Sequence, residues 1–124
     1  MLNIRVERRN QTTVVHCSGR IDFGEGLTRL RESLITEMNS RVIFLDLSRV
    51  TAIDAAGLGL LSFLHTRAAS RGSALKLVAP SPQVRNRLAL TRLDSVLTLA
   101  TAVEAREARQ PFYDTRLRDD VACA

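Results

Sequence analysis

The sequence predicts an α/β domain with a mixed sheet of four to five strands and about four helices. Short runs that alternate polar and apolar residues, or that are apolar throughout, are typical of strands and recur along the 124 residues. Between them lie longer stretches in which apolar residues return every three or four positions, the period of a helix. Strand–helix–strand units favour parallel pairing, so the predicted sheet combines an opening antiparallel hairpin with parallel strands.

The first part of the chain predicts a hairpin followed by one helix. Residues 2–7 alternate between aliphatic and polar side chains, and residues 12–18 are rich in β-branched residues, with a turn between the two runs. A glycine-rich passage over 19–26 then holds Asp22. Apolar residues at helical spacing over 27–39 predict an amphipathic helix.

The middle of the chain predicts a buried strand, a second helix and a further strand. Residues 42–48 form an apolar run with one acidic residue, the pattern of a central strand covered on both faces. Residues 57–70 predict a helix that is apolar on almost every side, and residues 74–79 predict the next strand. One stripe of this helix is expected to face the sheet: Leu61, Leu64 and Ala68. The other apolar side chains meet either another helix of the domain or a partner.

The last part predicts two helices separated by a short strand. Ser81 precedes a proline, a combination typical of a helix N-cap followed by the first helical position. Residues 96–99 predict a short edge strand, and a Thr-x-x-Glu capping box begins a helix over 101–109. We therefore expect one domain over residues 1–110 and a flexible tail over 111–124.

Composition excludes several classes of protein. The net charge of +5 comes from arginines spread along the whole chain, and aromatic residues make up only 4%, so stacking platforms for nucleic acid are not predicted. No apolar run approaches the roughly 20 residues that span a bilayer, which predicts no membrane insertion and a cytoplasmic location. The two cysteines lack the spacing of metal ligands, and no nucleotide-binding glycine motif is present, so no metal or other cofactor is expected.

The residues most indicative of function lie around Asp54. This carboxylate follows the central strand, and a helix starts within about three residues of it. The first backbone N–H groups of a helix are unpaired and carry partial positive charge, so small side chains such as Ala55 and Ala56 are exposed beside donors. Gly57 allows the chain to turn closely there, before the apolar residues that begin at Leu58.

Three passages resemble the STAS domain family, which includes anti-sigma-factor antagonists and the cytoplasmic tails of sulfate transporters. The first is VIFLDLSRVTAIDAAGLGLL over 42–61, where the family typically has an apolar strand, Asp-Leu, a short loop and Asp-Ser-Ser-Gly-Leu-Gly. GRIDFGEG over 19–26 resembles an earlier Gly-x-Leu-Asp element. The passage over 77–99 resembles the later strand–Ser-Pro–helix–strand element, so the similarity extends over 12–106.

This resemblance implies a protein-binding regulator rather than an enzyme. In antagonists of this type, the serine directly after the aspartate is phosphorylated by an anti-sigma factor that is also a GHKL-type serine kinase, and the partner is released by the added charge of roughly −1.5 to −2. Ala55 occupies the equivalent position here, followed by Ala56, so the hydroxyl that the family phosphorylates is absent. Two adjacent alanines favour a natural departure from the pattern over one engineered replacement.

The predicted partner is accordingly an anti-sigma factor of the GHKL kinase type. The predicted contact residues are Asp22, Asp54, Ala55, Ala56, Gly57 and Leu58. Asp22 and Asp54 are equally compatible with capping the helices that follow them. The alternative is a STAS scaffold in another assembly, such as an accessory subunit of an ABC-type lipid transporter ATPase or a stress-sensing complex. A homodimer is left open.

Two other functions fit the residues less well. A phospho-acceptor receiver domain needs an acidic pair after its first strand and a lysine after its last, whereas Glu7 is followed by arginines and Lys76 lies inside a strand. Asp46 is interpreted as structural. An enzyme is disfavoured because His16 in a strand and His65 in an apolar helix cannot be paired with a nucleophile from their spacing.

Overall fold

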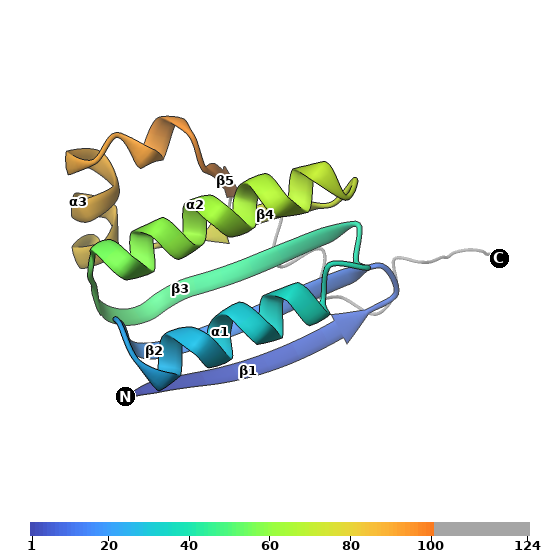
Figure 1. The fold of residues 1–124 in the computed structure, drawn as a ribbon, viewed down its shortest axis with the longest axis horizontal. Helices are drawn as coiled ribbons and strands as arrows, with labels where there is room; N and C mark the ends of the chain where they lie inside the picture. The colour runs from blue at the N-terminus through green and yellow to red at the C-terminus, as the bar shows by residue number, and fades with distance from the viewer. Residues whose placement is uncertain (101–124) are drawn as a thin grey trace, which may run out of the picture.

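The computed structural model describes residues 1–100 of the chain as one five-stranded sheet with three α-helices (Figure 1). The strands are β1 (Leu2–Arg9), β2 (Thr12–Ile21), β3 (Val42–Ile53), β4 (Ala74–Val78) and β5 (Thr98–Ala100). The helices are α1 (Glu25–Thr36), α2 (Ala55–Ser70) and α3 (Pro82–Leu90), and a 3-10 turn spans Leu93–Ser95. The predicted α/β class is confirmed. The fourth helix predicted over 101–109 and the tail over 111–124 lie outside the described residues.

Each strand of the sheet lies beside the strand that precedes it in the sequence, in the order β1-β2-β3-β4-β5. The β1–β2 pair is antiparallel and turns at Asn10, whose φ of 53° is in the left-handed region that asparagine tolerates. The other three pairs are parallel, as the helical connections require. The predicted mixed sheet, with one opening hairpin, is confirmed.

Helices α1 and α2 lie next to each other over one face of the sheet (Figure 1). Alternation along the strands directs Leu45 of β3 toward them, and Leu30 of α1 packs in the same core; both are fully buried. The predicted apolar stripe of α2 is confirmed, since its three members are fully buried: Leu61, Leu64 and Ala68. Burying each leucine of this core stabilises the fold by about 1.5–3 kcal/mol relative to leaving it exposed.

The opposite face of the sheet carries a smaller apolar cluster and a polar region. Val14, Phe44 and Val78 are buried together there. Along β3 the same face continues to Asp46, whose side chain is 23% exposed. The prediction that β3 is covered on both faces therefore holds at Phe44, which lies in the apolar cluster. It fails at Asp46, two residues further along the strand, because Asp46 lies beyond that cluster and is partly exposed.

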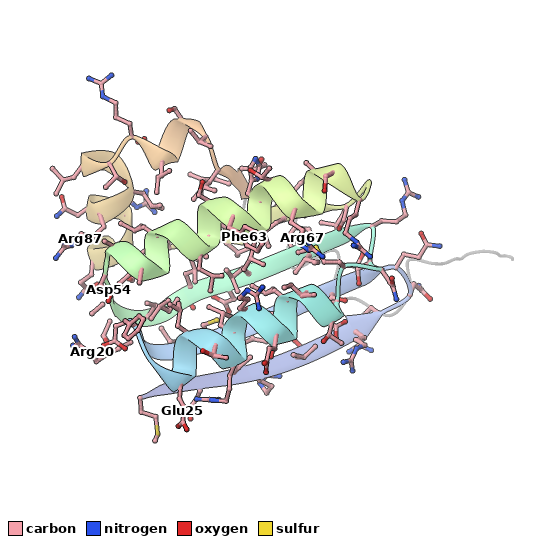
Figure 2. The ribbon with its side chains drawn as sticks, in the orientation of Figure 1. Arg20, Glu25, Asp54, Phe63, Arg67 and Arg87 are labelled. Atoms are coloured by element: carbon pink, nitrogen blue, oxygen red, sulfur yellow. The ribbon has the colours of Figure 1, made fainter. Side chains whose placement is uncertain are left out.

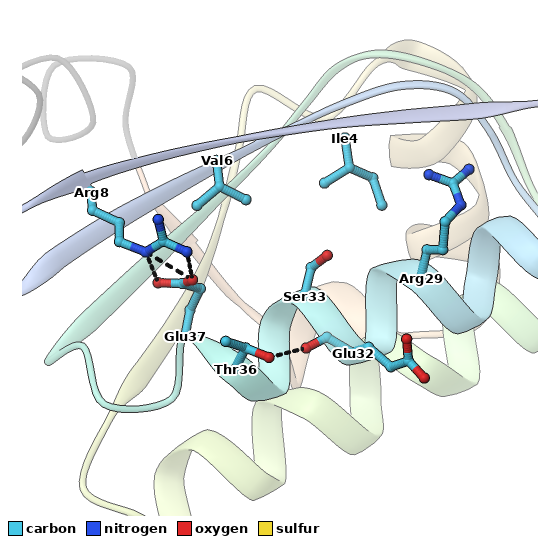
Figure 3. Close-up of a pocket in the computed structure, with 8 residues that line it drawn as sticks. All are labelled: Ile4, Val6, Arg8, Arg29, Glu32, Ser33, Thr36 and Glu37. Atoms are coloured by element: carbon cyan, nitrogen blue, oxygen red, sulfur yellow. Dashed lines mark hydrogen bonds and ion pairs between the residues drawn. The ribbon is translucent and has the colours of Figure 1, made fainter.

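A buried carboxylate ties the edge strand β1 to the end of α1. Glu37 is only 6% exposed, and Arg8 donates to both of its carboxylate oxygens beside a shallow pocket of about 390 Å³ (Figure 3). The hydroxyl of Thr13 donates to the same carboxylate. A buried charge is tolerated only when it is paired and hydrogen-bonded, and Glu37 meets both conditions. The hydrogen bonds to Glu37 raise the pKa of Arg8.

The clearest differences from the sequence prediction are the end of β3 and the start of α2. Strand β3 runs on to Ile53 instead of ending near Ser48, because irregularities in its pairing with β2 allow both strands to continue. Helix α2 begins at Ala55, two residues earlier than predicted, because Asp54 caps it.

Within residues 1–100, no helix is long and apolar enough to cross a membrane.

Candidate docking site at the start of helix α2

The candidate site lies where β2 and β3 end. These strands are parallel, so their C-terminal ends deliver the loop after β2 and the start of α2 to the same edge of the sheet. Figure 2 shows Arg20 and Asp54 at this end of the molecule, with Arg87 of α3 at the same end. Asp22 and Asp54, predicted separately from two motifs, are brought into one region by this topology.

Asp54 connects the two segments. Its Oδ1 accepts the backbone N–H of Gly57 at 2.8 Å, and its Oδ2 accepts the backbone N–H of Phe23 at 3.0 Å. The first bond is an N-cap of α2, and the second fixes the β2–α1 loop against the helix. These two backbone hydrogen bonds, from Gly57 first and Phe23 second, lower the pKa of Asp54. The capping role predicted for Asp54 is confirmed.

Gly57 allows α2 to begin directly against the end of β2. A Cβ added to Gly57 would lie 2.7 Å from the carbonyl oxygen of Ile21 and 2.7 Å from Cγ1 of Ile53, closer than real contacts allow. The neighbouring Leu58 is 6% exposed and belongs to the main core. The structure therefore places both predicted contact residues inside the domain, where they position the first turn of α2 and offer little surface of their own.

The exposed part of this first turn consists of methyl groups and backbone. Ala55 is exposed and Ala56 is partly exposed. One turn later Gly59 is exposed as well, and nothing lies within 4 Å of the Cβ that it lacks. These three residues, which we call the α2 platform, form a smooth surface without charge on the N-terminal half of the helix.

The loop after β2 adds an ion pair and an aromatic ring. Arg20 Nε lies 3.0 Å from Asp22 Oδ2, and the Asp22 side chain is 40% exposed. The structure assigns the N-cap position of α1 to Gly24, so the capping role considered for Asp22 is wrong. Phe23 is 84% exposed, although its backbone is held by Asp54.

Phe23 is the member of the site that sequence reasoning missed. Its signal is present in GRIDFGEG, because an aromatic residue between glycines and charged residues has no core position to fill. Phe63 of α2 is also partly exposed, at 44%, and the guanidinium of Arg31 lies 5.8 Å from its ring centroid. Aromatic side chains that remain exposed beside an apolar surface are typical of protein interfaces.

Two kinds of reactive group can be assessed in the described residues: clusters of metal ligands and the thiol of Cys17. Among residues 1–100, no three His, Cys, Asp or Glu side chains gather so that they could hold a metal ion. Cys17 is buried, and that burial, followed by the nearby charge of Asp46, raises the pKa of its thiol to about 12. The thiol is therefore protonated and shielded.

A mixed sheet with two helices on one face, and a capped helix start beside an exposed loop, together define the architecture of an α/β domain. The chain belongs to the STAS domain family, which matches residues 3–106. This agrees with the resemblance over 12–106 found in the sequence motifs.

Several solved structures share the fold. A putative anti-sigma factor antagonist from Thermotoga maritima is 26% identical, with a TM-score of 0.73 over 86% of this chain and 95% of that one. An anti-sigma factor antagonist from Mycobacterium paratuberculosis is 24% identical, with a TM-score of 0.72 over 89% and 96% of the two chains. The Bacillus antagonist SpoIIAA, in its unphosphorylated form, is 22% identical, with a TM-score of 0.71 over 85% and 94%.

Proposed function

We propose that the protein is a protein-binding regulator of the anti-sigma-factor-antagonist type, and that it docks an anti-sigma factor of the GHKL serine-kinase class through the α2 platform and the Asp22–Phe23 loop. The observation that carries the proposal is the uncharged, exposed first turn of α2, held against that loop by Asp54. The similarity to anti-sigma-factor antagonists over most of both chains supports it.

The surface has the composition of a docking site. Ala55 and Gly59 allow the close approach of a partner backbone, and Phe23 supplies a large apolar side chain at the margin. An aromatic side chain that becomes buried on binding is a common source of affinity at an interface. Asp22 and Arg20 supply a polar rim that can fix the orientation of the partner.

Under this proposal, the kinase partner cannot release the protein by phosphorylating position 55. Ala55 has no hydroxyl to accept a phosphoryl group, and neither has Ala56. Binding is then governed by the concentrations of the two proteins. The negative charge that a phosphate would bring can still be introduced by mutation, which supplies the test.

The proposal predicts that Ala55→Asp weakens partner binding by at least about tenfold, because a carboxylate is desolvated in the interface beside Asp54. The partner is first isolated by co-purification with the native chain from its host and identified by mass spectrometry. Its affinity for the purified chain is then measured by isothermal titration calorimetry. The matched control is Ala69→Asp, the same change at an exposed position near the other end of α2.

Three outcomes would count against the proposal. Equal affinities for Ala55→Asp and native protein would mean that the α2 platform is not the interface. Recovery of a transporter ATPase, with no anti-sigma protein, would favour the alternative in which this STAS domain is an accessory subunit of another assembly. Equal weakening by both aspartate substitutions would mean that the effect is not local to the first turn of α2.

A further inference from the structure

A second candidate site lies on the face of the sheet that points away from α1 and α2. It is a pocket of about 610 Å³ over strands β1, β2 and β3, and it adjoins the apolar cluster of that face, because His16 and Asp46 lie two residues beyond Val14 and Phe44 on their strands. Ligand pockets commonly have volumes of this order, about 300–1,000 Å³. The docking surface at the start of α2 shares none of its lining residues.

The floor of the pocket is an imidazole held between two carboxylates. His16 Nε2 lies 2.6 Å from Glu7 Oε1, and His16 Nδ1 lies 2.9 Å from Asp46 Oδ2. The three residues come from three adjacent strands, and Asp46 also accepts the backbone N–H of Ser48 at 3.0 Å. Both oxygens of Asp46 and both nitrogens of His16 are therefore engaged in hydrogen bonds within the floor of the pocket.

The pKa of Asp46 reflects this arrangement. Partial burial alone would raise its pKa, but the hydrogen bonds from Ser48 and His16 outweigh that effect and lower it. The carboxylate therefore stays ionised and paired at neutral pH. Its two oxygens are turned toward His16 and the backbone of Ser48, and each is engaged in a hydrogen bond there.

The rim of the pocket is dominated by hydrogen-bond donors. Arg5 lies beside His16 in the β1–β2 register; its side chain is 67% exposed and its guanidinium lies 3.8 Å from Glu7 Oε1, a long ion pair that leaves other N–H groups facing the pocket. Ser18 pairs with Arg49 in the β2–β3 register. Asn3 pairs with Ser18 on the other side, so one row of the rim crosses all three strands. Within residues 1–100, the Arg49 side chain is exposed and forms no hydrogen bond or ion pair.

We propose that this pocket binds a phosphate group, presented by a small polar molecule or as the free ion. Two guanidinium groups, Arg5 and Arg49, flank it, and the Arg fork matches phosphate oxygens in pairs. The hydroxyls of Ser18 and Ser48 add donors from the two inner strands. A phosphate group suits this rim because its several strong acceptor oxygens can be shared among donors from three strands.

The test is a titration of the ¹⁵N-labelled protein, followed by amide chemical shifts in NMR spectra. The probes are ribose 5-phosphate, inorganic phosphate and, as the neutral reference, ribose. Ribose 5-phosphate is expected to shift the amides of Ser18 and Arg49 saturably, with a Kd of about 1 mM or tighter. Tenfold tighter binding than inorganic phosphate assigns the site to an organic phosphate; equal binding assigns it to the free ion.

Variants separate this pocket from general attraction to a basic protein. Arg49→Gln is expected to weaken phosphate binding at least tenfold, and Ser18→Ala is expected to weaken it less. Arg85→Gln, which removes the same charge from an exposed position on α3, should leave the affinity unchanged. The proposal is overturned if neither phosphate probe binds saturably, or if Arg85→Gln weakens binding as much as Arg49→Gln does. Thermal unfolding of each variant verifies that its fold is intact.

Discussion

Asp54 joins two segments of the chain, because one carboxylate oxygen accepts the backbone N–H of Gly57 in its own helix and the other accepts that of Phe23, 31 positions earlier in the sequence. The bond to Gly57 starts α2, and the bond to Phe23 positions the exposed loop beside that start. Removing the carboxylate would leave both donors without their partner. The geometry of the docking surface thus depends on this side chain, although Asp54 itself is only partly exposed.

We expect Asp54→Ala to lower the free energy of unfolding by about 1–2 kcal/mol, the range measured for loss of a helix N-cap. Asp54→Asn should cost less, because an asparagine oxygen still caps the helix, but its amide nitrogen cannot accept the Phe23 N–H. Urea denaturation followed by circular dichroism measures both. Asp22→Ala, which removes an exposed ion pair, is the control and should change stability by no more than about 0.5 kcal/mol.

The lowered pKa of Asp54 predicts a loss of stability in acid. A carboxyl group whose pKa is lower in the folded state than in the unfolded state stabilises the fold at any pH above the unfolded value, about 3.9. That stabilisation disappears as the pH falls through the lower, folded value. The melting temperature should therefore fall below about pH 4, and Asp54→Asn should show a smaller fall over the same range. Identical acid profiles for the two proteins would assign the loss to other carboxyl groups.

At the scale of elements, helix α2 contains two glycines with opposite surroundings. Gly57 is pressed against Ile21 and Ile53, whereas Gly59 faces open space. Glycine inside a helix costs about 1 kcal/mol relative to alanine. The cost at Gly57 is offset by the close contact with β2, but no contact within the domain offsets the cost at Gly59.

We expect the two glycine-to-alanine substitutions to have opposite effects on the free energy of unfolding. Gly59→Ala should raise it by about 0.5–1 kcal/mol, because the new methyl group meets nothing and the unfolded chain loses freedom. Gly57→Ala should lower it by about 1–3 kcal/mol, because its Cβ collides with backbone. Equilibrium urea unfolding measures both. Stabilisation by both substitutions would show that the start of α2 can move away from β2.

The elements were largely predictable because their apolar periodicity is strong. The run over 42–48 and the stripe of Leu61, Leu64 and Ala68 identify a strand and a helix that share one core. The end of β3 was not predictable, since its continuation to Ile53 depends on irregular pairing with β2. That pairing is set by both strands together, so the sequence of β3 alone does not reveal it. The Leu93–Ser95 turn was missed for a similar reason, because three residues carry too little periodicity.

At the scale of the whole molecule, the docking surface was partly predictable and the phosphate pocket was not. Asp22 and Asp54 stand in motifs that can be read along the chain, and the parallel order of β2 and β3 then brings them together. His16 and Asp46 are 30 positions apart, and they meet only because of the register between their strands. Periodicity indicates that a strand exists but does not specify which residue of its neighbour lies opposite.

The strict sequential order of the strands affects how the chain acquires its structure. As synthesis proceeds from the N-terminus, each new strand finds its neighbour already available, and no later strand has to insert between two earlier ones. The hairpin of β1 and β2 can form first, because its pairing closes the shortest loop in the sheet. β3 then extends this template with α1 as the connection, so the sheet grows in the direction of translation. The edge on which β5 adds is the last to be completed.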